Sequence, residues 1–309
     1  MSWVALTCPQ CGAPLPRVAL WRSVKCGSCG SLIAKTESLV EREWFRKALA
    51  RARQDSSGGL QCGEARYQLL QKLGVGEISE VYLARRVASA PLLATLKLSS
   101  SPLAASRFAR EAEISRQLQL LDSGGAGPLF SRMLPEVMME GPAEGGPERR
   151  ALVLRHPSGF WGSLAALNEA FPSGLDPRHA VWIWRRMLEV LNFVHRHGWS
   201  HGDVRPEHAL VHPQDHAVRL IGWASARHGG GPGGRAADLA RSARVVQVLL
   251  CGNSEAWPDG VPPGLARLVT TASTDESFCD AHGAGGLDAL LRAEAKTAFG
   301  PPKFVHLAV

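Results

Sequence analysis

Two pairs of cysteines near the start of the chain have the spacing of a metal site. Cys8 and Cys11 form one C-x-x-C-G turn, and Cys26 and Cys29 form another. The glycine that follows each pair allows the positive φ that such a turn requires. Four thiolates that point at one centre make the closed tetrahedral set of a structural Zn²⁺. We therefore predict a zinc ribbon over residues 1–36, with all four cysteines as ligands.

Basic and aromatic side chains are frequent in the same segment. They are Arg17, Arg22, Lys25, Lys35, Trp3 and Trp21. A surface of this kind can bind phosphate groups, so a nucleic acid is one candidate partner. A solvated face over a small core explains the same residues, and we favour that interpretation. A redox role for the cysteine pairs is less favoured, because no βαβ pattern lies beside them.

A second set of residues could contact the phosphates of a nucleotide. Gly74 and Gly76 lie in a turn between two apolar segments, and Val81 begins the second of these segments. Glycines in a turn let backbone N–H groups approach an anion closely. The next apolar segment carries a single lysine, Lys97, and the helical pattern over 107–118 carries Glu111.

Longer elements must position these residues and those that follow. We expect a linker over 55–59, a strand–turn–strand over 67–84, a strand over 94–98 and helices over 37–54 and 107–118. The Trp-rich pattern over 179–197 predicts a long amphipathic helix. We also expect an apolar helix that opens at Asp238 and ends at Cys251-Gly252.

Taken in order, these motifs resemble the eukaryotic-like Ser/Thr protein kinases. The loop His201-Gly-Asp203-Val-Arg205 is similar to a kinase catalytic loop, and the similarity covers about residues 66–295. The resemblance implies an α+β, protein-kinase-like bilobal fold, with a β-rich N-lobe and an α-rich C-lobe, preceded by the small zinc ribbon. It also implies that the nucleotide-binding residues would be Gly74, Gly76, Val81, Lys97 and Glu111. Asp203 would be the catalytic carboxylate.

The sequence departs from the kinase pattern where Mg²⁺ is normally bound. His208 stands in place of the metal-binding Asn, and Gly222 stands in place of the Asp of Asp-Phe-Gly. Glycine offers no ligand oxygen, and a neutral imidazole is a poor ligand for Mg²⁺. The segment before Asp238 is short and glycine-rich, so little platform remains for a substrate peptide. These departures leave open whether the chain binds ATP. They predict that it does not use Mg²⁺.

We therefore predict a zinc-ribbon pseudokinase that acts as a regulatory or scaffolding module, with Asp203 vestigial or weak. A divergent active Ser/Thr kinase that uses ATP is the first alternative, so whether the chain is an enzyme stays open. A regulator tethered to nucleic acid through the basic ribbon is the second.

Composition and segment boundaries complete the predictions. The formal charge is +7, and apolar residues make up 45% of the 309 residues, as in a globular protein. No segment has the length and apolarity of a membrane span, so we expect a cytoplasmic location, and the GC-rich bias favours a bacterial source. We expect a ribbon over 1–36, a helix and linker over 37–59, a kinase-like domain over 60–295 and a C-terminal tail over 296–309. Bacterial chains of this type suggest phosphatases or von Willebrand A-type proteins as partners.

Overall fold

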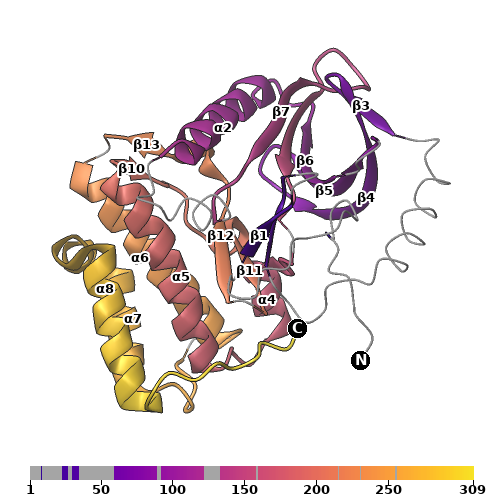
Figure 1. Cartoon of the computed structure of the whole chain (residues 1–309). Helices are drawn as coiled ribbons and strands as arrows, with labels where there is room; N and C mark the ends of the chain where they lie inside the picture. Colours follow the sequence, from indigo (N-terminus) through magenta and orange to yellow (C-terminus); the bar gives the residue numbers. More distant parts are fainter. Residues whose placement is uncertain are drawn as a thin grey trace, which may run out of the picture. The chain divides into compact units, whose positions relative to one another are not determined.

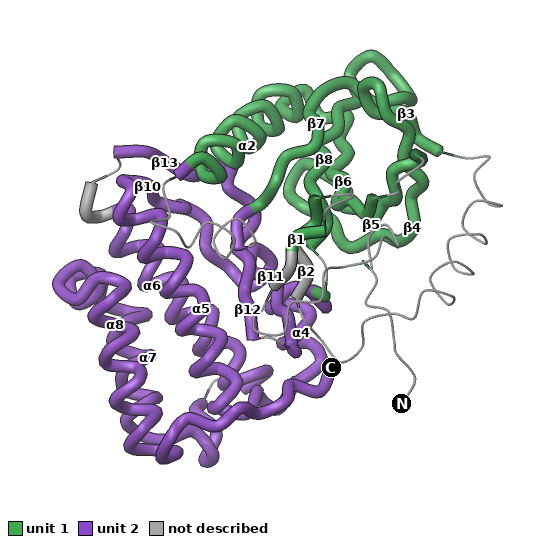
Figure 2. The backbone as a smooth tube through the Cα atoms, viewed as in Figure 1, with its two compact units in different colours: residues 1–120, 135–159 green, residues 121–134, 160–309 purple. Residues whose placement is uncertain are grey.

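The structure is a computed structural model. It describes residue 8 and residues 23–26, 30–34, 59–88, 92–121, 133–157, 159–214, 216–229, 231–254 and 256–309. Cys11, Cys29 and the expected helix over 37–54 lie outside the described residues. The chain divides into two compact units, coloured separately in Figure 2, and each is described here by itself. Unit 1 holds residues 1–120 and 135–159, and unit 2 holds residues 121–134 and 160–309.

A six-stranded antiparallel sheet and the helix that packs on it form most of the described part of unit 1 (Figure 1). The strand order is β3-β4-β5-β6-β8-β7. Helix α2 (Ala104–Gln119) packs on β7 and β8. The strands are β3 (Leu60–Cys62), β4 (Ala65–Val75), β5 (Glu80–Arg86), β6 (Leu93–Ser99), β7 (Val137–Pro142) and β8 (Arg150–Arg155).

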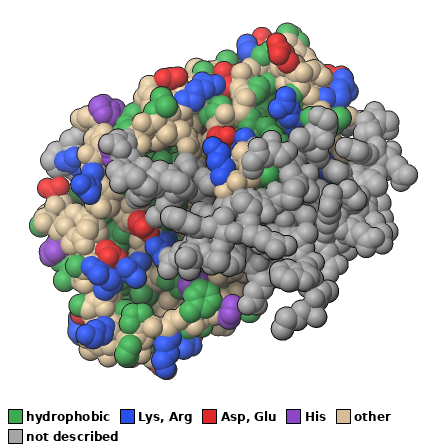
Figure 3. Space-filling model, viewed as in Figure 1, with side chains coloured by type: hydrophobic (Ala, Val, Ile, Leu, Met, Phe, Trp, Pro, Cys, Tyr) green, Lys and Arg blue, Asp and Glu red, His purple; other side chains and the backbone are tan. Residues whose placement is uncertain are grey.

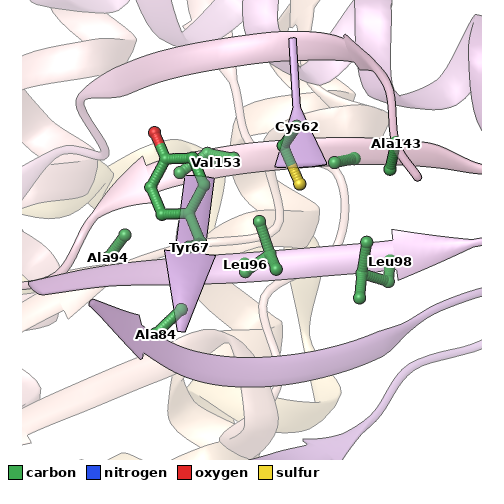
Figure 4. Close-up of a cluster of buried hydrophobic side chains, with 9 residues drawn as sticks. Cys62, Tyr67, Ala84, Ala94, Leu96, Leu98, Ala143 and Val153 are labelled. Atoms are coloured by element: carbon green, nitrogen blue, oxygen red, sulfur yellow. The ribbon is translucent and has the colours of Figure 1, made fainter. Parts of the chain in front are cut away.

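Alternating side chains of these strands build the core of the sheet. Ala84, Ala94 and Leu96 are fully buried and meet Tyr67 and Cys62 between the strands, as Figure 4 shows. The other face carries a second cluster, in which Leu152 and Leu154 of β8 meet Phe108 of α2. Because successive strand residues point to opposite faces, Lys97 leaves the Leu96 core and points to the α2 side.

A short hairpin precedes the sheet in the same unit. β1 (Ser23–Lys25) pairs with β2 (Leu32–Ala34), so the two strands flank the second cysteine pair. Between them, Gly30 has a φ of 72°, which confirms the positive φ expected for a glycine after the second cysteine of a pair. The two strands lie on either side of the second cysteine pair, and the Gly30 turn reverses the chain between them.

Unit 2 is mostly helical, with short strands between the helices (Figure 1). Its helices are α4 (Leu164–Ala170), α5 (Pro177–Arg196), α6 (Gly231–Cys251), α7 (Pro263–Thr274) and α8 (Glu276–Phe299). The first turn of α5 shows why it begins where it does. Asp176 caps the helix by accepting a bond from the Arg178 amide, and Pro177 takes the first helical position, which needs no N–H. None of the helices in the described part of the chain has both the length and the apolar character to cross a bilayer.

The strands of unit 2 position its polar loop. They are β9 (Gly162–Ser163), β10 (Trp199–Ser200), β11 (Ala209–His212), β12 (Ala217–Leu220) and β13 (Arg227–His228). β11 pairs with β12 and β9, and β10 pairs with β13. The hairpin of β11 and β12 begins one residue after His208 and ends two residues before Gly222. Its ladder therefore brings those two residues together.

The prediction for the start of α6 was wrong. The helix begins at Gly231, so Asp238 lies two turns inside it and does not open it. Glycines are poor helix formers, and the sequence pattern therefore placed residues 231–234 in a loop. A proline is tolerated in the first turn of a helix, which is where Pro232 falls. Asp238 is fully buried and lies in the interior of the helix.

Candidate functional site

Strand register places the predicted nucleotide residues of unit 1 in one row. Gly74 of β4 pairs with Val81 of β5, and Val81 pairs with Lys97 of β6. Residues opposite each other in an antiparallel pair share a face, so Val81 and Lys97 point to the same side. From α2, Glu111 reaches the same lysine: its two carboxylate oxygens lie 2.6 and 2.8 Å from Lys97 Nζ.

The ion pair between Lys97 and Glu111 is largely removed from solvent. The Lys97 side chain is 14% exposed and the Glu111 side chain 5%. A charge pair at this depth needs close geometry to offset the loss of hydration, and both oxygens meet that requirement. The pair fastens α2 to the sheet. It also holds one ammonium group beside the strand that follows the glycine turn.

The glycine turn is closed by its own backbone and tied to its neighbours. The Gly76 amide donates to the Ser79 carbonyl at 2.7 Å. Glu77 pairs with Arg107 of α2 at 2.6 Å, and the Ser99 hydroxyl donates to the Ile78 carbonyl. A cavity of about 570 Å³ lies beside the turn, and Gly76, Ser99 and Arg149 are among its lining residues. Of the predicted nucleotide residues, Gly76 lines this cavity, whereas Lys97 and Glu111 meet each other on the α2 side of the sheet.

The polar loop of unit 2 carries Asp203. The Asp203 side chain is 37% exposed, and its Oδ2 lies 3.6 Å from Arg205 Nη2 and 3.3 Å from His208 Nδ1. The Asp203 amide donates to His201 Nδ1 at 3.2 Å. The carboxylate is thus held between a guanidinium and an imidazole in its own loop.

Hydrogen bonds within the loop hold His208 in place. Its Nδ1 lies 2.8 Å from the Asp203 carbonyl oxygen, and its Nε2 lies 3.2 Å from Arg205 Nη2. A guanidinium only donates, so Nε2 accepts and the Nδ1–H donates to the carbonyl. These contacts orient the ring in the loop, with Nδ1 toward the Asp203 carbonyl and Nε2 toward Arg205.

The His208 ring packs directly on Gly222. A Cβ built on Gly222 would lie 2.7 Å from both Cε1 and Nδ1 of that ring and 2.8 Å from Cδ2. The ladder explains this proximity, because the Ile221 amide donates to the His208 carbonyl at 2.9 Å. Gly222 also has a φ of 79°, a backbone conformation that residues other than Gly rarely adopt. The imidazole therefore fills the space from which a side chain at residue 222 would extend.

Asp238 is a loop-organising residue that the sequence alone did not reveal. Its carboxylate accepts from the His201 amide at 2.6 Å and from the Gly202 amide at 2.8 Å. It also lies 3.1 Å from His195 Nε2. An acidic residue within an apolar helical run was the available signal, since a buried carboxylate must be paired with donors.

His201 is buried beneath this loop and packs on Trp223. Its Nε2 lies 3.0 Å from the Ile221 carbonyl oxygen, and the two rings are 4.3 Å apart between centroids. Burial lowers the pKa of His201 to about 4, partly opposed by the nearby Asp238 carboxylate. His201 is therefore a neutral packing residue that orients the loop backbone.

Part of the predicted zinc ribbon lies within the described residues. Cys8 and Cys26 are buried. Around Cys26 the chain folds back tightly: the Gly30 amide donates to the Cys26 carbonyl at 2.9 Å, and the Cys26 amide donates to the Ser31 carbonyl at 2.8 Å. No group of three or more potential metal ligands occurs within the described residues, which exclude Cys11 and Cys29.

The turn after Cys26 also contacts the sheet of unit 1. The Ser31 hydroxyl lies 3.2 Å from Arg155 Nη1, at the end of β8, and Arg155 pairs with Glu136 at 2.8 Å. Ser31 is buried, and the Arg155 side chain is 19% exposed. The second cysteine turn is therefore attached to the six-stranded sheet, a contact that no sequence pattern indicated.

Comparison with known proteins found similarity to protein kinases. The Ser/Thr protein kinase PknB of Mycolicibacterium smegmatis is 31% identical over 176 residues, which are 52% of this chain and 24% of that kinase. PknD of Mycobacterium tuberculosis is 29% identical over 175 residues, covering 54% of this chain and 23% of PknD. The plant protein kinase PVPK-1 of Phaseolus vulgaris is 28% identical over 154 residues, covering 49% and 23%.

These similarities are weak, and no protein-family model matches the chain. The chain spans about a quarter of the length of the curated relatives it matches. The mixed α/β structure, with its six-stranded sheet and long helices, is consistent with the same class. Weak similarity to Ser/Thr protein kinases over about half of its length thus supports a protein-kinase-like family for this chain.

Proposed function

We propose that this chain is a pseudokinase, a kinase-shaped module that regulates or scaffolds a protein partner with little or no phosphotransfer. The observation that carries the proposal is the packing of His208 on Gly222. Phosphoryl transfer depends on Mg²⁺ to neutralise charge on the phosphates, and two side chains normally hold it. Here one position has no side chain, and the imidazole at the other is already bonded to Asp203 and Arg205.

The segment after Gly222 supports the same proposal. β13 ends at His228 and α6 begins at Gly231, so few residues lie between the polar loop and the next helix. The two residues of β13 pair with β10 within unit 2. A segment this short offers little surface on which a substrate peptide could be laid.

Nucleotide binding without Mg²⁺ is part of the proposal. Lys97 keeps its pair with Glu111, and Gly74 and Val81 lie in register with it. Gly76 closes the turn that follows. Lys97 would contact ATP phosphates through its ammonium group, and the two glycines would let the backbone of the turn approach them closely. Mg²⁺ would add little because its usual ligands are missing.

A structural zinc in the ribbon also belongs to the proposal. Two facts support it. The chain turns tightly after Cys26, as a C-x-x-C pair would need, and both Cys8 and Cys26 are buried. Cys11 and Cys29 would complete the four-thiolate set. Zn²⁺ would act there as a structural tie, since four protein ligands leave no open position for chemistry.

A protein partner is favoured over nucleic acid, because a solvated face over a small core accounts for the basic and aromatic residues of the predicted ribbon. Most of those residues, Arg17, Arg22 and Lys35 among them, lie outside the described part of the chain. On the face shown in Figure 3, basic and acidic side chains of the described residues are interspersed.

The decisive experiment measures phosphate transfer and nucleotide binding in parallel. Radiolabelled ATP is offered with Mg²⁺ to the full chain and to an Asp203→Asn variant, and thermal unfolding is followed with ATP in the presence and absence of Mg²⁺. We expect equal background labelling of the two chains, and any ATP stabilisation to be independent of Mg²⁺. Labelling that Asp203→Asn abolishes would instead establish an active Ser/Thr kinase.

A further inference from the structure

The segment that follows α8 is bound to unit 2 by an aromatic sandwich. The His216 ring stacks on Trp182 of α5 at a centroid distance of 4.1 Å and an interplanar angle of 1°. On its other side, Phe304 stacks on the same ring at 4.2 Å and 14°. His216 therefore lies between a helix residue and a residue of the segment over 301–309, which Figure 1 shows in yellow running back from α8 past α5.

Further contacts fix the segment along its length. His216 Nε2 lies 2.8 Å from the Val305 carbonyl oxygen, to which it donates. Leu307 is buried, although it belongs to no helix or strand. Stacking at Phe304, a hydrogen bond at Val305 and burial of Leu307 therefore hold this irregular segment against unit 2.

The backbone at His216 is shaped to present the ring. His216 has a φ of 52°, and among the described residues it is the non-glycine residue with a positive φ. Its carbonyl accepts from Arg186 Nε of α5 at 3.0 Å. Left-handed backbone is unfavourable for a residue with a Cβ, so the surrounding contacts must compensate for it.

The docking point has a particular place in the fold. His216 lies in the turn between β11 and β12, the hairpin that carries His208 at its first end and Gly222 at its last. The segment over 301–309 thus contacts the turn between β11 and β12. This turn lies at the end of the hairpin opposite to His208 and Gly222.

We propose that residues 301–309 are a strap that braces the β11–β12 hairpin through the Trp182–His216 surface. Capture of the strap by a partner would loosen the hairpin and with it the packing of His208 on Gly222. The occupant of this surface is the chain's own segment, held by Phe304 and Leu307. The inference does not depend on whether the chain transfers phosphate.

The test compares variants of the full chain. Phe304→Ala removes the outer ring of the sandwich from a side chain that is 57% exposed, so the fold should persist. His216→Gly removes the central ring at a backbone conformation that glycine prefers. Val309→Ala is the matched control, because Val309 is 46% exposed and makes none of the stacking contacts described.

Two readouts are needed. Trypsin cleavage after Lys303 reports release of the strap, and amide exchange over 209–220 reports the hairpin. We expect Phe304→Ala and His216→Gly to speed cleavage roughly three- to tenfold, and Phe304→Ala to speed hairpin exchange by a similar factor, as loss of one aromatic stack implies. Val309→Ala should match the unmodified chain. Unchanged cleavage in Phe304→Ala would overturn the strap, and faster cleavage with unchanged hairpin exchange would overturn the bracing.

Discussion

At the scale of single residues, the close packing of His208 on Gly222 leaves no room for a side chain at residue 222. A Cβ at residue 222 would lie 2.7 Å from the imidazole, and the backbone there has a φ of 79°. Two separate costs follow, one from the contact with the ring and one from the backbone conformation. The two can be measured apart, because the chain contains a second glycine with only the backbone cost.

Gly222→Asp should lower the free energy of unfolding by about 2–3 kcal/mol through overpacking and strain together. Gly229→Asp is the control, because Gly229 has a φ of 70° but open space around its Cβ position. We expect that control to cost about 1 kcal/mol. Combining Gly222→Asp with His208→Asn should recover at least about 1 kcal/mol relative to additivity. Chemical denaturation of these chains measures the coupling, and additive effects would refute the contact.

The buried imidazole of His201 predicts how stability depends on pH. Its pKa falls to about 4 in the folded chain, from an ordinary value of 6.5. Between these values the unfolded chain binds a proton at this residue and the folded chain does not. The contribution of His201 to stability is therefore complete above about pH 6.5 and declines as the pH falls toward 4, by about 3 kcal/mol in total. Denaturation midpoints between pH 4 and 7 measure the slope, and His201→Asn should flatten it. An equal slope in both chains would show that another group is responsible.

At the scale of elements, the pair between Lys97 and Glu111 joins β6 to α2. Removing one partner leaves the other charge buried, whereas replacing both by apolar groups does not. The pair therefore has a mechanical role in unit 1 whether or not it contacts a nucleotide.

Lys97→Met should destabilise the chain by about 3 kcal/mol, because the Glu111 carboxylate then lacks its cation. The double variant Lys97→Met with Glu111→Leu should recover most of that loss. Lys72→Met is a suitable control, since Lys72 forms an ion pair with Glu80 on the surface of the same sheet. It should leave the midpoint of denaturation nearly unchanged. If the double variant were less stable than Lys97→Met, the buried charge would not be the cause.

The elements themselves were largely predictable from the sequence. Alternation over 67–84, the apolar run around Lys97 and the amphipathic pattern of α5 each predicted the element found, because each pattern has the period of its backbone. The start of α6 was not predictable in this way. Its first turn is rich in glycine, and glycine has a low helix propensity. The packing of His208 on Gly222 and the role of Asp238 were also missed, because contacts between distant residues leave no local periodicity.

At the scale of the whole molecule, the second cysteine turn and the six-stranded sheet belong to one unit. The Arg155 guanidinium at the end of β8 donates a hydrogen bond to the Ser31 hydroxyl, so the second cysteine turn is held by the sheet as well as by its own backbone. The predicted metal would then secure a segment that is also attached to the sheet.

We expect one zinc per chain, bound by Cys8, Cys11, Cys26 and Cys29. A structural zinc contributes on the order of 10 kcal/mol to the folding of such a segment. Chelation should therefore unfold residues 1–36 and leave the sheet and helices of the kinase-like part intact. Elemental analysis and amide exchange before and after chelation measure this. Cys62→Ser is a control, because burial raises the pKa of that thiol to about 11, and it should leave the zinc content unchanged. Absence of zinc from protein prepared without chelators would refute the prediction.

The contact between His208 and Gly222 also constrains how this lineage can change over generations. A mutation that places an acidic residue at 222 brings its Cβ against the imidazole, so this single substitution costs stability. In the proposed pseudokinase, the contact would make the return of a metal-binding carboxylate at 222 unfavourable in one step. Among natural relatives, residues 208 and 222 should therefore vary together, with acidic residues at 222 accompanied by smaller side chains at 208.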